Sequence, residues 1–177
     1  ILSIGESARV IERGDADACF AGGAESKVNL MGIMRTAVAG RLADTRGTPG
    51  VDGADVIRPY DGGAPGTLIG EGAGIMIAEE AEHAAARGAA AYAEIAGFGA
   101  GQSVDAALPG VFEGVGATAD WSRGLAGMPE DRALTRSIRS ALRDAGIGPE
   151  EIDAVVPGAI GVPEADAREA GALREVF

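Results

Sequence analysis

Acidic side chains and a single histidine are the residues of this chain best suited to acid–base or metal chemistry. His83 lies in the segment EEAEHAAARG, and the nearby carboxylates belong to Asp61, Glu71, Glu79, Glu80 and Glu82. A metal ion needs several ligand atoms directed at one point, and most transition-metal sites include further His or Cys ligands. The spacing of these carboxylates does not converge, so we expect no metal site and no bound cofactor. We expect His83 to be solvated or to cap a helix.

A second pair of carboxylates, Asp166 and Glu169, is spaced three residues apart in PEADAREAGALREVF. Residues at this spacing lie on one face of a helix. We expect a structural role for both, either helix capping or pairing with an arginine. The segment just before them, residues 157–162, contains no acid, base or hydroxyl group that could act on a substrate.

Glycines spaced two apart, Gly70, Gly72 and Gly74, precede the apolar run 75–78. On a strand they lie on one face and leave it without side chains, which lets another backbone approach closely. A dinucleotide fingerprint would instead place GxGxxG between a strand and a helix, and a phosphate loop would continue into Lys-Ser/Thr. We therefore expect packing glycines in a strand buried on both faces, followed by a helix over 79–87.

Hydrophobic periodicity predicts the elements that must position these residues. In the first half we expect a helix over 1–13 that ends at Gly14, and a buried strand over 16–21 closed by Gly22 and Gly23. Residues 25–42 are expected to be partly helical, and 44–55 to form a loop.

In the second half, strands are expected at 91–95 and 153–156, with a glycine turn at 97–103. Helices are expected over 129–146, ended by Gly146, and over 163–177, with Pro163 near the first position; a short helical turn at 149–151 lies between them. Residues 104–128 show no period and are expected to form a long loop, either at the surface or over a pocket.

The composition is that of a globular protein with an acidic surface. Hydrophobic residues make up 46% of the 177 residues, and the net charge of −12 argues against nucleic-acid binding, which needs a basic surface. No apolar run reaches the ~18 residues of a membrane span. Cys19 is the only cysteine, so we expect no internal disulfide and a reducing, cytoplasmic location. Its apolar setting, ADACFAGG, predicts a buried structural thiol.

Several motifs, in order, resemble the β-ketoacyl synthase family. RPYD is followed by GEGAG, an apolar strand, EEAEHAAARGA and YAEIAGFG, with ILSIGESARVIERGDADACFAGGAES upstream and ALRDAGIGPEEIDAVV downstream. The resemblance implies an α/β, thiolase-like layered fold of helices and mixed five-stranded sheets. Residues 1–88 would be the end of the N-terminal ketosynthase half and residues 89–177 the start of the C-terminal half. Since the chain lacks an initiating Met, we expect a fragment truncated at both ends.

The resemblance also implies where catalytic residues would stand. In ketosynthases a nucleophilic cysteine lies at the N-terminus of the helix that here includes Ile1, so the nucleophile position lies upstream of Ile1. The family's first catalytic histidine belongs to an HGTxT motif that is followed by an Asp and a Glu at fixed distances. Asp166 and Glu169 keep that spacing, which puts Gly158 at the histidine position. On this alignment the chain carries no catalytic residue.

Ketosynthase-like chains without that histidine resemble the chain-length factor, the β subunit of type II polyketide synthases. VVPGAIGVPEADAREAGALREVF is similar to that subfamily. The likeness implies a non-catalytic partner that forms a heterodimer with a catalytic ketosynthase and shapes its polyketide tunnel. Acyl carrier protein would then be met only indirectly, through the catalytic subunit.

Two other functional classes stay open. A fragment of an active β-ketoacyl-[acyl carrier protein] synthase, performing decarboxylative Claisen condensation, would need a cysteine upstream of Ile1, and Gly158 argues against it. A non-enzymatic interaction module on a thiolase-like scaffold would need a complete fold here, and the start inside a helix argues against that. The residue at the nucleophile position discriminates, since Gln favours the chain-length factor and Cys the enzyme.

Overall fold

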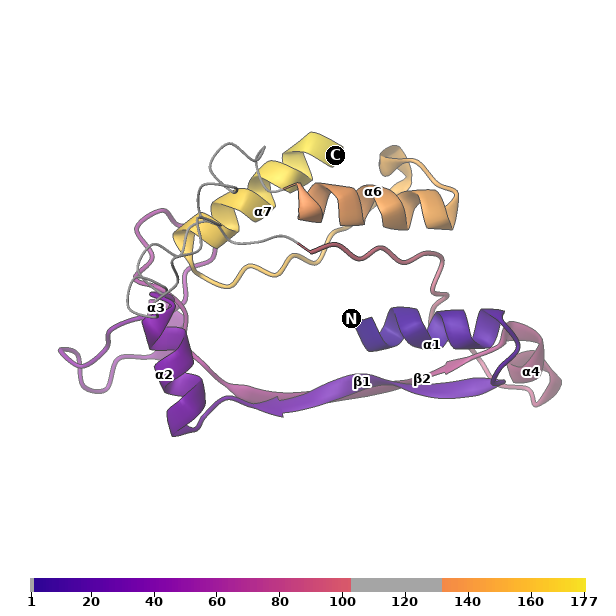
Figure 1. Ribbon diagram of the computed structural model, residues 1–177, viewed down its shortest axis with the longest axis horizontal. Coiled ribbons are helices and arrows are strands. Elements are labelled where there is room, and N and C mark those ends of the chain that lie inside the picture. The colour runs from indigo at the N-terminus through magenta and orange to yellow at the C-terminus, as the bar shows by residue number, and fades with distance from the viewer. Residues whose placement is uncertain (1, 103–131) are drawn as a thin grey trace, which may run out of the picture.

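The computed structural model describes residues 2–102 and 132–177. In chain order its elements are α1 (Leu2–Glu12), β1 (Ala18–Ser26), α2 (Leu30–Val38), α3 (Gly53–Val56), β2 (Glu71–Glu79), α4 (Ala81–Ala86), α6 (Ala133–Ala145), the 3-10 turn η1 (Pro149–Glu151) and α7 (Pro163–Val176). Figure 1 shows α1 lying along the β1–β2 pair, with α6 and α7 together in a further layer. The expected loop at 104–128 and residues 129–131 of the expected helix lie outside the described residues.

Helix α1 packs through small side chains. Gly5 is buried beside the ring of Phe98, and a Cβ at position 5 would come within 2.5 Å of that ring. The hydroxyl of Ser3 donates to the carbonyl of Gly22 in β1 at 2.9 Å. Gly14 has φ 72°, the left-handed conformation that ends many helices, so the predicted end of this helix is confirmed.

Strands β1 and β2 form an antiparallel pair in which Gly22 lies opposite Ile75 and Gly23 opposite Gly74. Gly22 has φ 153°, and a Cβ there would lie 2.1 Å from the carbonyl oxygen of Gly74. Only glycine fits so close to the neighbouring backbone. The prediction that Gly22 and Gly23 close the strand is therefore wrong, because β1 continues through both glycines to Ser26.

The β1–β2 pair is not buried on both faces, as the apolar run had led us to expect. Ile75 and Ile77 are 69% and 63% exposed, whereas Ala21 and Ala78, on the opposite face, are buried. A Cβ at Gly70, Gly72 or Gly74 would meet nothing within 4 Å. Two strands with one helix along them leave most of this surface uncovered.

Close approach by glycine instead occurs where residues 97–101 cross α6. A Cβ at Gly97 would lie 2.4 Å from the Ala141 carbonyl oxygen, and one at Gly99 would lie 2.0 Å from that of Ser137. Because these glycines are spaced two apart, one face of the extended segment is bare and its backbone lies directly on the helix.

The helices of the second half follow the predictions, whereas the two strands do not. Gly146 ends α6 with φ 70°, η1 forms the expected turn, and Pro163 stands at the start of α7. Residues 91–95 and 153–156 are not paired as strands, and Tyr92 and Val156 are almost wholly exposed. An extended segment becomes a strand only when another backbone pairs with it. Within the described residues the single sheet has two strands, so the five-stranded sheets expected do not form there.

Candidate functional site

The carboxylates of Asp166 and Glu169 organise the loop before α7, where the sequence predicted an emptied catalytic position. Glu169 accepts hydrogen bonds from the backbone N–H of Gly158 at 2.7 Å and of Ala159 at 2.9 Å, one on each carboxylate oxygen. A Cβ at Gly158 would lie 3.1 Å from Glu169 Oε1. Position 158 therefore stands directly against the glutamate.

Asp166 likewise accepts backbone N–H groups, from the two residues that follow Ala159. Only 2% of Asp166 is exposed, and its carboxylate accepts from the N–H groups of Ile160 and Gly161, each at 3.0 Å. A third N–H, that of Tyr60, donates to Asp166 Oδ2 at 3.0 Å. A buried carboxylate is tolerated when hydrogen bonds replace its water, and here three backbone donors do so.

Tyr60 joins the RPYD turn to this loop through its side chain as well. Its hydroxyl donates to Glu169 Oε2 at 2.8 Å. Burial, together with the hydrogen bond to Glu169, raises the pKa of Tyr60 to about 12. Tyr60 and Ala159 both have positive φ, 58° and 44°, which is uncommon for residues other than glycine. The carboxylates thus hold two unusual backbone conformations together.

The pKa of Glu169 lies below its usual value. Burial acts to raise this pKa, but the N–H groups of Ala159 and Gly158 and the hydroxyl of Tyr60 outweigh burial and lower it. Glu169 is therefore an ionised hydrogen-bond acceptor at neutral pH, with no proton to donate to a substrate.

Chemically, the loop has little left to offer a reacting group. The N–H groups of residues 158–161 all point to carboxylates of α7, so none is available to stabilise a developing oxyanion. None of the side chains from Gly158 to Gly161 is an acid, a base or a hydroxyl. The arrangement shapes the loop and does not supply a catalytic donor.

Asp166 and Glu169, the carboxylate pair singled out from the sequence, bind backbone N–H groups and Tyr60, where we had expected helix capping or pairing with an arginine. Tyr60 was not singled out from the sequence, because its partner Asp166 is 106 residues away and only the RPYD motif marks it.

Cys19 is half-buried and free, so the prediction that its thiol is buried is wrong.

His83 lies on α4 with its side chain 48% exposed, which agrees with the solvated alternative, and the residue that caps the helix is Glu80. The backbone N–H of His83 donates to the N-cap residue Glu80 at 2.7 Å, and its ring nitrogen Nδ1 lies 2.6 Å from Glu79 Oε1. Side-chain hydrogen bonds from Arg87 and His83 lower the pKa of Glu79 to about 2. Among residues 2–102 and 132–177, no group of three or more His, Cys, Asp or Glu side chains could hold a metal ion.

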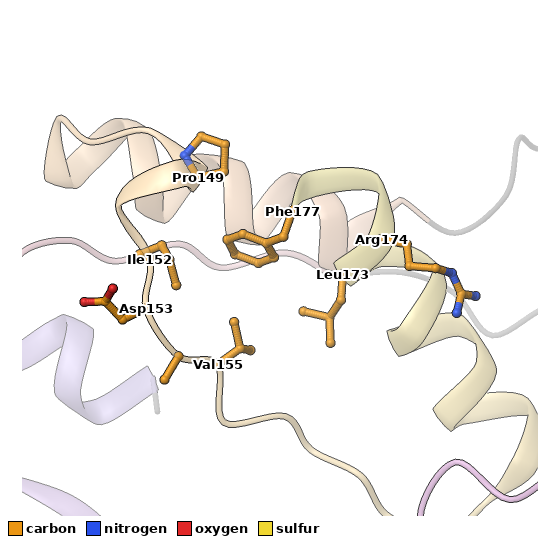
Figure 2. Close-up of a pocket in the computed structure, with 8 residues that line it drawn as sticks. Pro149, Ile152, Asp153, Val155, Leu173, Arg174 and Phe177 are labelled. Carbon is orange, nitrogen blue, oxygen red and sulfur yellow. The ribbon is translucent and has the colours of Figure 1, made fainter.

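An open hollow of about 460 Å³ lies between the 152–155 segment and the end of α7. Figure 2 shows the apolar side chains of Ile152, Val155, Leu173 and Phe177 around it, with the charged groups of Asp153 and Arg174 directed away. Its lining contains no nucleophile and no paired acid and base, so we assign it no chemistry.

Two family models match the chain. The model described as "Beta-ketoacyl synthase, N-terminal domain" matches residues 2–84, and "Beta-ketoacyl synthase, C-terminal domain" matches residues 110–177. The chain belongs to the β-ketoacyl synthase family. Its described elements are accordingly part of a thiolase-like ketosynthase fold, which confirms the fold class inferred from the sequence.

Relatives of this ketosynthase-family chain include named synthases. The 3-oxoacyl-[acyl-carrier-protein] synthase 2 of Coxiella burnetii is 35% identical over 176 residues, which are 99% of this chain and 37% of that protein. The protein of the same name from Staphylococcus aureus is 34% identical over 175 residues, 99% of this chain and 38% of its own length. The chain therefore spans less than two fifths of the relatives that it matches.

Solved ketosynthase structures share the fold at a similar coverage. The ishigamide ketosynthase/chain length factor superimposes with a TM-score of 0.74 at 34% identity, covering 99% of this chain and 36% of that one. A type II PKS acyl-carrier protein in complex with its ketosynthase bound to the hexaketide gives 0.76 at 26% identity, covering 98% and 38%. No helix in the part of the chain that the structure describes is long and apolar enough to cross a membrane.

Proposed function

We propose that this ketosynthase-family chain belongs to a chain-length factor, the non-condensing partner of a type II polyketide ketosynthase, acting in the cytoplasm. The observation that carries the proposal is the loop at Gly158, which we align with the family's catalytic histidine. Decarboxylative condensation needs hydrogen-bond donors for the enolate and the thioester oxyanion. Glycine supplies no side-chain donor, and the neighbouring backbone N–H groups already bind Glu169 and Asp166.

The proposed alignment is supported by the carboxylates themselves. Asp166 and Glu169 follow Gly158 at the distances at which ketosynthases place an Asp and a Glu after their first histidine. Both carboxylates accept backbone N–H groups of residues 158–161, which supports the proposal that they hold a loop from which the imidazole is absent. A scaffold that retains its support but lacks its donor fits a subunit that shapes a site and does not catalyse.

The partner we propose is the catalytic ketosynthase subunit, in a heterodimer, with acyl carrier protein engaged through that subunit. Phe20, Ile75 and Ile77 share one face of the β1–β2 pair and are 80%, 69% and 63% exposed. Contiguous apolar surface of this kind is typically covered by further protein. We also propose that residues 1–88 and 89–177 belong to the two halves of the ketosynthase fold.

The mechanism we propose is steric. Side chains at the heterodimer interface close the tunnel into which the partner's polyketide grows, and the room left sets the number of extender units. No charge transfer or covalent step on this chain is required.

An active β-ketoacyl-[acyl-carrier-protein] synthase is the second candidate. It is favoured by one observation, the 34–35% identity to proteins named 3-oxoacyl-[acyl-carrier-protein] synthase 2. This candidate requires a nucleophilic cysteine at the position that we place upstream of Ile1, and another group to replace the donor missing at Gly158.

Co-expression from the native coding sequence with the cognate ketosynthase tests the proposal. Products are analysed by mass spectrometry with and without this protein, and with the partner's nucleophilic cysteine replaced by alanine. We expect polyketides of defined length only when both wild-type proteins are present, and none with the alanine variant. Products of unchanged length without this protein, or products with the alanine variant, would overturn the proposal.

A further inference from the structure

Two Asp–Gly pairs, Asp52–Gly53 and Asp61–Gly62, occur in this chain, and the proposed function uses neither. An aspartate can react with a glycine that follows it, because glycine has no side chain to shield its backbone nitrogen. The nitrogen attacks Cγ, a C–N bond forms, and a carboxyl oxygen leaves as water together with the N–H proton. Water then opens the succinimide ring. Opening between nitrogen and Cγ restores aspartate, whereas opening between nitrogen and the main-chain carbonyl carbon gives isoaspartate, whose main chain runs through Cγ.

The carboxyl group of Asp61 is held over the peptide that follows it. Its Oδ1 accepts from the N–H of Gly63 at 2.8 Å, two residues on, so the carboxyl group lies beside the intervening nitrogen of Gly62. Arg58 Nη1 lies 3.2 Å from Oδ2, and Arg58 Nη2 donates to the Gly63 carbonyl at 2.6 Å. Because the Arg58 and Asp61 side chains are 47% and 42% exposed, their ion pair is weak and does not prevent the reaction. The contacts bring the reacting groups together, which favours attack.

The Asp52–Gly53 pair has a similar local contact but a more constrained backbone. Asp52 is the N-cap of α3, and its Oδ1 accepts from the N–H of Ala54 at 3.0 Å. Gly53 is the first residue of that helix, and its carbonyl accepts from the N–H of Ile57 at 3.0 Å. Attack requires the glycine nitrogen to swing toward Cγ, which would break the cap and the first turn. Gly62 belongs to no helix or strand and is exposed, so its peptide is freer to rotate.

Two backbone turns meet at Asp61, and one of them positions Tyr60. The N–H of Asp61 donates to the Arg58 carbonyl at 3.3 Å, and the N–H of Ala64 donates to the Asp61 carbonyl at 3.0 Å. The first turn holds Tyr60 at φ 58°, where its N–H reaches the carboxylate of Asp166. Isoaspartate adds one carbon to the main chain and converts the main-chain carbonyl of residue 61 into a carboxylate. The two turns cannot both keep their geometry, so the contacts of Tyr60 with α7 should weaken.

We propose that the Asp61–Gly62 bond is a site of spontaneous isoaspartate formation, and that the modified turn no longer holds Tyr60 against α7. The two steps release and then consume one water molecule, so the composition of the protein is unchanged and no enzyme or oxidant is needed. Water reaches the bond because Gly62 and Gly63 are exposed. The modification accumulates with the age of the protein molecule. The inference does not depend on the proposed chain-length role.

Ageing of the full protein and of two synthetic peptides in the same warm, neutral buffer tests the site. Each peptide spans one Asp–Gly pair, and isoaspartate at each position is quantified by electron-transfer mass spectrometry, which distinguishes the isomers. We expect similar rates in the two peptides. In the folded protein we expect at least about fivefold faster formation at Asp61 than at Asp52, since the N-cap of α3 must first open. A rate at Asp52 that equals or exceeds that at Asp61, or no isoaspartate at Asp61 while the peptides convert, overturns the proposal.

The variant Gly62→Ala tests the structural consequence. An added Cβ at this position would meet nothing within 4 Å, so the variant should fold, and the methyl group shields the attacking nitrogen. The matched control is Gly53→Ala, whose Cβ would approach only Leu68 Cδ1, at 3.4 Å. Urea unfolding of fresh and aged samples should show a loss of stability on ageing in the wild type and in Gly53→Ala, and none in Gly62→Ala. An equal loss in Gly62→Ala, or isoaspartate at Asp61 without any loss, contradicts the proposal.

Discussion

Gly158, Asp166 and Glu169 are best understood together at the residue scale. Position 158 has no side chain, while the two carboxylates hold the backbone around it by accepting one N–H from each of residues 158–161. Tyr60 adds its own N–H and hydroxyl from the RPYD turn. The backbone conformation of the loop is therefore held independently of any side chain at position 158. Replacements at Glu169 should change that conformation.

Replacing Glu169 with Gln should destabilise the protein by about 1–3 kcal/mol. The amide has only one oxygen, so the two N–H groups of Gly158 and Ala159 cannot both keep a side-chain acceptor. The free energy of unfolding is measured with urea in wild type and variant. The control is Glu164→Gln, an exposed glutamate at the start of the same helix, which should change stability by no more than about 0.5 kcal/mol. Equal effects of the two changes would count against the loop contacts.

The contribution of Glu169 should depend on pH with a definite sign. Its pKa is lowered from the ordinary value of 4.5, because its hydrogen bonds with Ala159, Gly158 and Tyr60 outweigh burial. A lowered pKa stabilises the folded state at all pH values above 4.5, and this stabilisation is lost as the pH falls through the folded pKa. The stability gap between wild type and Glu169→Gln should accordingly shrink when urea unfolding is repeated well below pH 4.5. A gap that widens in acid would show that the sign is wrong.

At the scale of elements, two backbones come into close contact at glycines, which have no side chain to separate them. The stripe at Gly97 and Gly99 lets an extended segment rest on α6, and Gly22 lets β1 pass close to β2. By contrast, Gly171 lies inside α7, where an added Cβ would meet nothing within 4 Å. These glycines provide opposite tests of the packing.

Replacing Gly99 with Ala should destabilise the protein by about 1–3 kcal/mol, because the new Cβ would lie 2.0 Å from the Ser137 carbonyl oxygen. Replacing Gly171 with Ala should stabilise it by roughly 0.5–1 kcal/mol, since alanine favours a helix interior and has room there. Thermal unfolding of both variants checks the pair. Two shifts of the same sign would contradict the packing of the 97–101 segment on α6.

The sequence predicted helices more reliably than strands. The helices α1, α6 and α7 carry their own signals, such as Gly14 and Gly146 at their ends and Pro163 at a beginning. A strand depends on a partner that local sequence does not reveal, and residues 91–95 and 153–156 have none among the described residues. The same limit applies at the site, because the contact between Tyr60 and Asp166 joins residues 106 positions apart.

At the scale of the whole molecule, the exposed apolar face of the β1–β2 pair is the main surface to be accounted for. Phe20 and Ile77 lie opposite each other across the strands and are 80% and 63% exposed. Their exposure means that a polar replacement removes little packing within the described chain. It should act mainly on association with other protein.

Replacing Phe20 with Glu should weaken co-purification with the cognate ketosynthase at least ~10-fold, because a buried, unpaired carboxylate in an interface is costly. The matched control is Val38→Glu on α2, where the wild-type side chain is 69% exposed and lies outside this face. Undiminished association of the Phe20 variant, or an equal loss in both variants, would mean that this face is not where the partner binds.

Condensation by the purified protein alone tests the central claim most directly. Release of CO₂ from malonyl thioester and formation of a 3-oxoacyl product are followed in the absence of any other ketosynthase, with the cognate pair as the positive control. Because Gly158 supplies no donor and the N–H groups of its loop are occupied, the account predicts no 3-oxoacyl product above background from this protein alone, and efficient condensation from the pair. Condensation by the protein alone at a rate like that of the pair would contradict the account.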